Sequence, residues 1–259
     1  MSDATPELLG EARPHSHFVQ LHAADERSLL ENVGRYAAEG LIRDEAVVVI
    51  ATTRRRTAIA AAIRQAGSDP AAAIARDQLI FLDANETLRR FMIEGQPDPQ
   101  RFDDVVGTLV RDLRERAVGL RAYGEMVGVL WEAERYAAAI RLEELWNALL
   151  AANDFELFCA YPIDVFGTEF RSAEVDALLS THTHLLPGSA ELQRSVDRAM
   201  DEVLGCRAEG VRALSDRACR PDWAALPNAE AAILWLRTNL PDYAGEILAR
   251  ARRYSRTAA

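Results

Sequence analysis

The chain has 259 residues, of which 49% are hydrophobic and 27% are charged, a composition typical of a water-soluble globular protein. Forty acidic residues against thirty basic ones give a net charge of −10, which argues against a surface built to neutralise nucleic-acid phosphates or anionic lipid. Every basic residue is arginine, since the sequence contains no lysine. This excludes Schiff-base chemistry, a pyridoxal anchor and the lysine of a standard phosphate loop.

The cysteines and the N-terminal segment predict where the protein resides. Cys159, Cys206 and Cys219 show neither a C-x-x-C pair nor the even spacing of a disulfide framework, so we expect free thiols in a reducing compartment. Residues 1–14 are polar, contain no apolar signal region and are expected to be disordered. No apolar stretch exceeds six residues, as in Ala46–Ala51, so no membrane span is expected. The sequence therefore predicts a cytoplasmic protein.

Strands and helices alternate along the first 180 residues. The stretch 46–51 is continuously apolar, as is typical of a strand buried on both faces of a parallel sheet. Strands are expected at 18–22, 46–51, 78–83, 118–124 and 155–161. Helices are expected from an Asp25 N-cap to a stop at Gly40, at 54–66 before Gly67, after the capping box Asp83-Ala-Asn-Glu86, and at 99–117, 135–152 and 172–182. This order predicts an α/β fold with a doubly wound, mostly parallel sheet of five or more strands.

The strand pattern ends at Pro187-Gly188-Ser189. Apolar residues then recur at helical spacing over 192–214 and predict one long helix, and two shorter helices are expected to open at Pro227-Asn228 and Pro241-Asp242. The charge balance changes at the same place, from 30 acidic and 19 basic residues over 1–189 to 10 acidic and 11 basic residues beyond. We therefore expect an α/β domain over 15–188 and an all-helical extension over 189–259.

The turn after the first strand is where nucleotide-binding folds place a glycine-rich phosphate loop. Here it reads Leu21-His-Ala-Ala-Asp-Glu-Arg-Ser28, and only Ser28 matches the pattern G-x-x-x-x-G-K-[ST], with Arg27 in place of the lysine. Asp25 and Glu26 would repel a triphosphate. The turn is therefore not expected to bind ATP.

The five histidines fall into two groups. His15, His17 and His22 lie around the first expected strand, and His182 and His184 lie at the end of the last expected helix of the α/β domain. The spacing H-x-H is a weak signal of metal binding, because residues two positions apart on a helix do not share a face. Capping or surface positions are the favoured interpretation, with a ligand-responsive cluster and a structural metal as the alternatives. We assign no metal and no cofactor from the sequence.

Three further segments carry candidate binding residues. Glu125 follows a glycine at the end of the fourth expected strand, which is the edge where open α/β sheets bind ligands. Glu143 and Asn147 are four residues apart and share one helix face, where they are suited to line a pocket or to pair with an arginine. Cys159 is expected to be an inert buried thiol, because no histidine lies near it in the sequence.

Taken in order, these segments resemble the DcmR-type sensory domain known as MEDS over about residues 15–188. The matching features are His17, Gly40-Leu41, Ala46-Val-Val-Val-Ile-Ala-Thr52, Gly67, Leu79–Asp83, Phe91-Met92 with Gly95 and Pro97, Arg121 with Gly124-Glu125-Met126, Leu142-Glu143 with Leu145-Trp146-Asn147, Cys159-Ala-Tyr161, and His182-x-His184 with Pro187. The resemblance implies a sheet related to the RecA/KaiC-like ATPase core that has lost its phosphate loop. It also implies a sensor of small molecules, proposed to be hydrocarbon derivatives, upstream of kinase or DNA-binding modules. The tail over 189–259 departs from that pattern, because it is too short for a histidine kinase and shows no PAS-like strands.

The sequence favours a non-enzymatic cytoplasmic sensor that binds a small molecule or a signalling partner at the carboxyl edge of its sheet. One crevice there, with Glu125 as polar anchor and Tyr161 as a wall, is expected to be lined by His17, His22, Glu125, Glu143, Asn147, Cys159 and Tyr161. Two alternatives stay open. One is a divergent ATPase in which Arg27 replaces the lysine and Glu125 activates water, and the other is an adaptor that forms a homodimer or holds a partner through 192–214. Arginines at 250, 252, 253 and 256 also suit a helix end, so DNA binding is not expected.

Overall fold

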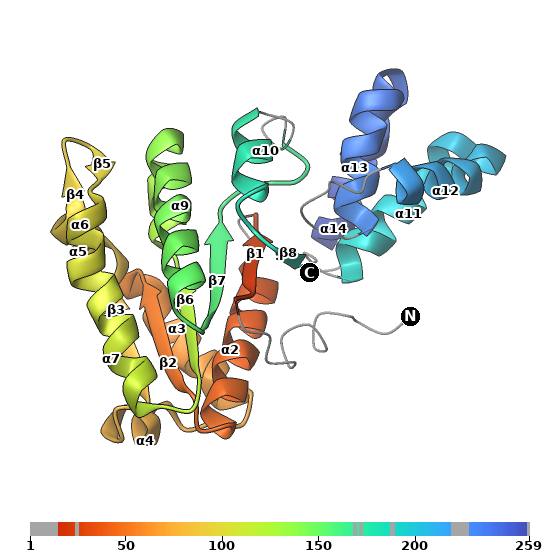
Figure 1. Cartoon of the computed structure of the whole chain (residues 1–259). Helices are drawn as coiled ribbons and strands as arrows, with labels where there is room; N and C mark the ends of the chain where they lie inside the picture. The colour runs from red at the N-terminus through yellow and green to blue at the C-terminus, as the bar shows by residue number, and fades with distance from the viewer. Residues whose placement is uncertain are drawn as a thin grey trace.

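The structure is a computed structural model and describes residues 15–23, 26–167, 170, 173–186, 190–218 and 228–257. Its centre is a parallel sheet of six strands in the order β3-β2-β6-β7-β1-β8, which confirms the predicted fold class (Figure 1). The strands of this sheet are β1 (His17–Leu21), β2 (Ala46–Ala51), β3 (Leu79–Asp83), β6 (Leu120–Gly124), β7 (Glu156–Tyr161) and β8 (His184–Leu186). A short antiparallel pair, β4 (Met92–Ile93) and β5 (Gln96–Pro97), lies outside it.

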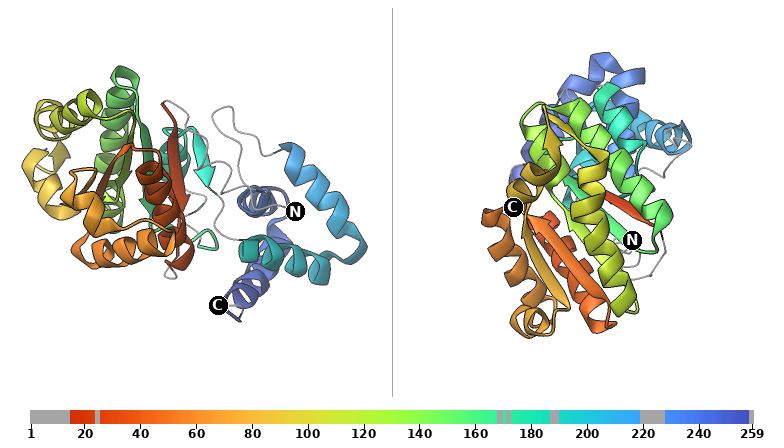
Figure 2. Two further views of the ribbon diagram at one scale, coloured as in Figure 1. Left: turned by 90° about the horizontal axis from the view of Figure 1, so that it is seen from below. Right: turned by 60° about the vertical axis from the view of Figure 1, so that its left-hand side comes forward.

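Helices cover both faces of the sheet and form a three-layer domain (Figures 1 and 2). One face packs against α2 (Arg27–Ile42), α3 (Thr53–Gln65) and α4 (Pro70–Ala75). The other face packs against α5 (Ala84–Phe91), α6 (Pro99–Phe102), α7 (Thr108–Arg116), α8 (Met126–Glu132), α9 (Tyr136–Ala152) and α10 (Ala173–Leu179), with a π-helical turn over Asp103–Gly107. Burial on both faces is the reason that β2 is apolar at every position.

One boundary of the predicted helices is wrong for a local reason. Helix α2 continues past Gly40 to Ile42, and the left-handed backbone that ends it falls on Asp44 with φ of 59°. Gly40 is instead a packing position, because a Cβ there would lie 2.9 Å from Cδ of Arg121. Helix α3 ends as predicted, with Gly67 at φ of 96°.

The end of the α/β domain differs from its prediction. The expected helix over 172–182 ends at Leu179, and β8 follows as a sixth strand whose His184 pairs with Phe18 of β1. A strand of three residues is too short to show a recognisable periodicity in the sequence. The predicted disorder over 1–14, the Asp25 N-cap, the boundary residues 187–189 and Cys219 lie outside the described residues.

The C-terminal extension is helical, and its helices lie beside the β1–β8 edge (Figure 2). They are α11 (Ala190–Leu204), a 3₁₀ turn (Gly205–Arg207), α12 (Ala208–Ala218), α13 (Asn228–Asn239) and α14 (Pro241–Thr257). The predicted single long helix over 192–214 is therefore wrong, because Gly205 takes a left-handed backbone with φ of 56°. Leu192, Val196 and Met200 are buried within the chain, whereas Leu214 is 54% exposed. Most of the apolar stripe thus belongs to the chain's own core, and the homodimer contact stays a prediction.

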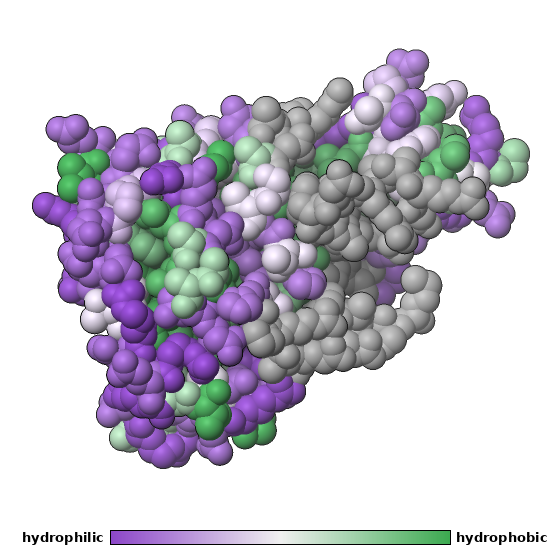
Figure 3. Space-filling view, in the orientation of Figure 1, coloured by the Kyte–Doolittle hydropathy of each residue, from purple (hydrophilic) through white to green (hydrophobic). Residues whose placement is uncertain are grey.

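The outer surface of the described residues is mostly hydrophilic in the view of Figure 3, with smaller apolar areas between. The large apolar side chains that are exposed are Ile42, Ile74, Ile93, Val118, Leu214 and Tyr243. Within the described ranges, no helix combines the length and the apolar character that crossing a membrane requires.

Candidate functional site

The seven predicted site residues lie in two places rather than in one crevice. Five of them, His17, Glu143, Asn147, Cys159 and Tyr161, meet beneath α9 on the face of the sheet. The other two, His22 and Glu125, lie at the carboxyl edge of the strands. The prediction of one common crevice is therefore wrong, since His17 opens β1 at the opposite end of the strand from His22.

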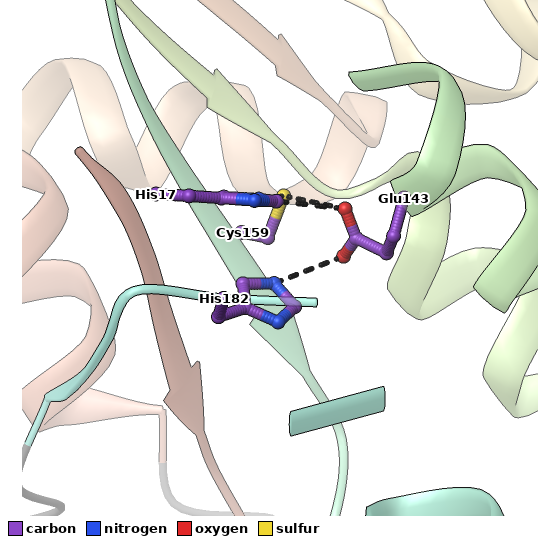
Figure 4. A group of neighbouring side chains, drawn as sticks. All are labelled: His17, Glu143, Cys159 and His182. Carbon is purple, nitrogen blue, oxygen red and sulfur yellow. Dashed lines mark hydrogen bonds and ion pairs between the residues drawn. The ribbon is translucent and has the colours of Figure 1, made fainter. Parts of the chain in front are cut away.

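Strand register brings the first group together. Strands β1 and β7 are parallel neighbours, with His17 opposite Leu157 and Val19 opposite Cys159. Because side chains alternate along a strand, His17 and Cys159 both face the layer that contains α9. Glu143, which points at them in Figure 4, and Asn147, which contacts His17, lie one helical turn apart on α9. All the members of this group are thus held by regular secondary structure.

The contacts in this cluster are short and link every member (Figure 4). The His17 ring places Nδ1 2.8 Å from Oδ1 of Asn147, and its Nε2 lies 3.4 Å both from Sγ of Cys159 and from Oε2 of Glu143. Sγ of Cys159 is 3.6 Å from the same carboxylate oxygen. The Tyr161 hydroxyl donates to Oε1 of Glu143 at 2.6 Å. Within the described ranges, Glu143 pairs with no arginine, contrary to one of the two expectations for it.

His182 completes the cluster and was not among the predicted site residues. It lies between α10 and β8, and its Nε2 is 3.1 Å from Oε1 of Glu143. Its ring centroid is 4.1 Å from that of His17. His17 is 1% exposed and His182 2% exposed, so neither is a surface group, although Nδ1 of His182 does lie 3.0 Å from the Leu178 carbonyl oxygen in the last turn of α10, as in a capping contact. One signal for this contact was present in the sequence, namely two histidine groups that could pack against each other.

The hydrogen bonds limit which ring nitrogen of each histidine carries a proton. The Asn147 amide donates from Nδ2 to the Thr181 carbonyl at 2.7 Å, so its Oδ1 faces His17 and accepts from Nδ1. Nδ1 of His182 lies 3.0 Å from both the Leu178 carbonyl oxygen and the Thr181 hydroxyl oxygen, so it can donate to either oxygen or accept from the hydroxyl. In the neutral tautomers that carry the proton on Nδ1, the Nε2 lone pair of each ring is directed at the Glu143 carboxylate.

The electrostatics of the cluster follow from its burial. Burial, the neighbouring Glu143 carboxylate and its hydrogen bond raise the pKa of the Cys159 thiol well above its usual range, so the thiol is not an activated nucleophile. Burial and the adjacent His17 lower the pKa of His182 and favour its neutral imidazole. Burial acts to raise the pKa of Glu143, but positive charge on the two histidines outweighs it and the pKa falls.

At the carboxyl edge, Glu125 is 1% exposed and binds the end of the neighbouring strand. Its Oε2 accepts from the backbone N–H of Thr52 at 2.9 Å and from the Thr52 hydroxyl at 3.2 Å, and its Oε1 accepts from the Tyr123 hydroxyl at 3.1 Å. Nη1 of Arg55 lies 3.5 Å away. Burial raises the pKa of Glu125, against the opposing effect of Arg55 and these donors.

The turn after β1 carries an ion pair. Oε1 of Glu26 lies 2.5 Å from Nη2 of Arg54 and 2.8 Å from Nη2 of Arg55, both in the first turn of α3. The hydrogen bond from Arg55 lowers the pKa of Glu26. His22 bridges this turn to β7, since its backbone N–H donates to the Tyr161 carbonyl at 2.9 Å, and burial lowers the pKa of its ring.

A cavity of about 320 Å³ opens at this edge. It is lined by Thr52, Arg54, Arg55, Gly128, Val129, Glu132 and Pro162. These residues follow β2, β6 and β7 in the chain. Strands β2 and β6 are neighbours, but β2 is followed by β3 on one side of this pair and β6 is followed by β7 on the other side. Open α/β sheets bind ligands at such a point of divergence. Glu125 contacts the lining of this cavity through its hydrogen bonds to Thr52, and Tyr161 precedes the lining residue Pro162 in the chain.

An open parallel sheet with helices on both faces and a crevice at its carboxyl edge places the chain among the doubly wound α/β proteins. Residues 16–183 match the family described as MEDS, the MEthanogen/methylotroph, DcmR Sensory domain. The chain belongs to this family of sensory domains, as its sequence resemblance implied. No curated protein matches the chain.

Proposed function

We propose that this chain is a cytoplasmic sensory protein without enzymatic activity. In this proposal, the MEDS domain binds a small oxygenated or halogenated hydrocarbon in the crevice at the carboxyl edge of its sheet. The observation that carries the proposal is the cavity of about 320 Å³ at the point where the chain diverges after β2 and β6. Its volume is at the lower end for ligand pockets, which favours a molecule of few heavy atoms.

The turn after β1 supports a receptor rather than an ATPase. A phosphate at that turn would compete with the Glu26 carboxylate for the guanidinium groups of Arg54 and Arg55. Glu125, the residue expected to activate water in an ATPase, is buried and already accepts three hydrogen bonds. We therefore infer a RecA/KaiC-like sheet that has lost its phosphate loop, in line with the sequence resemblance.

The loop after β7 provides a route from the crevice to the C-terminal helices. Pro162 lines the crevice, and two residues later the Asp164 carboxylate pairs with Arg252 of α14. Phe166 in the same loop contributes to a second cavity of about 480 Å³. The remaining lining residues of that cavity are Arg237, Pro241, Ala244, Gly245, Leu248, Ala249 and Arg252, all in or next to α13 and α14. A ligand that displaces Pro162 would thus change the contacts of α14.

Such signalling requires that the ligand bind two arrangements of α14 with different affinities. In one arrangement, Arg252 and Asp164 are paired, as in this structure. In the other, the pair is broken and α14 is held less tightly. We therefore expect ligand affinity to change when this ion pair is removed, although Arg252 does not line the crevice.

The test uses thermal-shift and calorimetric titrations with five probes: methanol, ethylene glycol, formate, acetate and dichloromethane. We expect at least one saturable response in the full chain. The response should be lost in Val129→Phe, which fills the crevice, and retained in the matched variant Val118→Phe, whose valine is 77% exposed elsewhere. Arg252→Ala should change the affinity without abolishing binding.

Three outcomes contradict the proposal or one of its parts. The absence of a saturable response to all five probes would refute the class of ligand. A response that is equal in the wild type and in Val129→Phe would remove the crevice as its site, and an equal response in Glu125→Ala would remove the carboxylate below it.

A further inference from the structure

Four metal-binding side chains from separate parts of the chain converge in the core. They are His17 of β1, Glu143 of α9, Cys159 of β7 and His182 of the segment before β8 (Figure 4). One ligand atom from each lies within 4.8 Å of the other three, and all four residues are buried. This set of two imidazoles, one thiol and one carboxylate is separate from the crevice, whose lining residues include none of them.

The spacing of these atoms fits tetrahedral coordination. With metal–nitrogen and metal–oxygen bonds of about 2.0–2.1 Å and a metal–sulfur bond of about 2.3 Å, the edges of a tetrahedron are roughly 3.3–3.6 Å long. Nε2 of His17 lies 3.4 Å from Sγ of Cys159 and 3.4 Å from Oε2 of Glu143, and the sulfur lies 3.6 Å from that oxygen. His182 is at 3.1 Å from the other carboxylate oxygen. A small shift of the Glu143 carboxylate would therefore complete the site.

The orientation of the histidines provides an independent observation. Nε2 of His182 is buried and has no hydrogen-bond partner within the described part of the chain, although a carboxylate oxygen is 3.1 Å away. When its Nδ1 donates to the Leu178 carbonyl, the Nε2 lone pair points at the carboxylate. Nε2 of His17 is directed in the same way when its Nδ1 donates to Asn147. Two ring nitrogens that face one carboxylate in this way need a cation between them, either a proton on the ring or a metal ion.

We propose that His17, Glu143, Cys159 and His182 form a closed, four-coordinate site for a divalent transition-metal ion, for which Zn²⁺ is the best fit. Zn²⁺ accepts imidazole, thiolate and carboxylate together in tetrahedral geometry. On binding, the Cys159 S–H bond breaks, its proton passes to solvent and the sulfur binds the metal. The thiolate and the carboxylate then balance the two positive charges of the ion, so the buried site is neutral.

The surrounding residues act as the outer shell of such a site. Metal-bound histidines usually donate their other ring N–H to a carbonyl or similar acceptor, which fixes the ring. Here Asn147 accepts from His17, and the Leu178 carbonyl accepts from His182. The Tyr161 hydroxyl donates to Glu143 at 2.6 Å and orients the carboxylate. With all four positions taken by protein, the metal holds the segment that leads into β8 against the sheet and is structural rather than catalytic.

The first experiment measures the metal content of the tag-free full chain, purified without chelator, by inductively coupled plasma mass spectrometry. We expect about one metal ion per chain. Protein treated with chelator and then titrated with Co²⁺ should develop the thiolate-to-cobalt charge-transfer band in the near ultraviolet. The band should be lost in Cys159→Ser, with Co²⁺ affinity at least about tenfold weaker. It should be unchanged in Cys206→Ser, the matched variant at an exposed free cysteine.

A second variant keeps the test decisive if Cys159→Ser does not fold. Cys159→Asp replaces the thiolate by another zinc ligand, so it should keep its metal, lose the charge-transfer band and fold only with Zn²⁺ present. Wild-type protein that is purified without metal and gives no band with Co²⁺ would overturn the proposal. So would a band that persists in Cys159→Ser. Neither result depends on the response of the crevice to organic probes.

Discussion

The substitution Gly128→Ala tests the packing that forms the floor of the crevice. Gly128 lies in α8, where an added Cβ would be 2.7 Å from the Ala160 carbonyl oxygen and 3.4 Å from Cδ of Pro162. The oxygen cannot move away easily, because Ala160 of β7 is paired with Gln20 of β1. Helix α8 must therefore shift by several tenths of an ångström.

The sign of the effect depends on two opposing contributions. Overpacking costs about 1–3 kcal/mol, and replacing glycine by alanine within a helix gains about 1 kcal/mol. Since backbone atoms stand on both sides of the contact, overpacking is expected to dominate, with a net loss of about 1–2 kcal/mol. Gly245→Ala in α14 is the matched control. No atom lies within 4 Å of its added Cβ, so it should gain about 0.5–1 kcal/mol.

Urea unfolding and thermal unfolding, both followed by far-ultraviolet circular dichroism, measure the two variants. The melting temperature of Gly128→Ala should fall by roughly 2–8 °C, and that of Gly245→Ala should rise. If Gly128→Ala stabilises the protein as much as Gly245→Ala does, α8 does not pack on β7 as described.

Three further predictions address the charged groups. Glu26→Gln should lower the free energy of unfolding by less than about 1 kcal/mol at neutral pH. The difference should vanish as the pH falls below 4.5 and through the lowered pKa of Glu26, because a carboxylate with a depressed pKa stabilises the fold only while it is ionised. Urea unfolding over a pH series measures this, and a difference that grows in acid would contradict it. Arg121→Met should lower the free energy of unfolding by about 3–5 kcal/mol in the same assay, because it leaves Glu45, which lies 2.5 Å from the guanidinium, as an unpaired carboxylate. A loss below about 1 kcal/mol would show that the pair contributes little. Purified protein should not hydrolyse ATP with Mg²⁺, and turnover that disappears in Arg27→Ala would support the ATPase instead.

The sequence predicted the sheet well because its strands are short and buried. The run 46–51 is apolar throughout, and β2 occupies those residues. The capping box at Asp83 was also informative, since its side chain accepts from the Glu86 N–H at the start of α5. By contrast, β8 has three residues and could not be distinguished from the end of the preceding helix.

The buried cluster could be predicted only in part. The resemblance supplied His17, Glu143 and Cys159 as candidate residues, but 126 residues separate the first two in the sequence. Their contact depends on β1 lying next to β7, which no local pattern indicates. His182 was assigned to the end of a helix, whereas the helix ends three residues earlier and the chain turns inward. Long-range register is thus the information that the sequence alone did not contain.

Tyr161 lies between the two proposed sites. Its hydroxyl binds Glu143, and its backbone carbonyl accepts from His22, so both ends of the residue are held. A metal ion on Glu143 would restrain this end of β7 further. Pro162 follows at once and lines the crevice. Displacement by a ligand would therefore be confined to the loop that begins at Pro162, whose Asp164 contacts α14, rather than spread into the sheet.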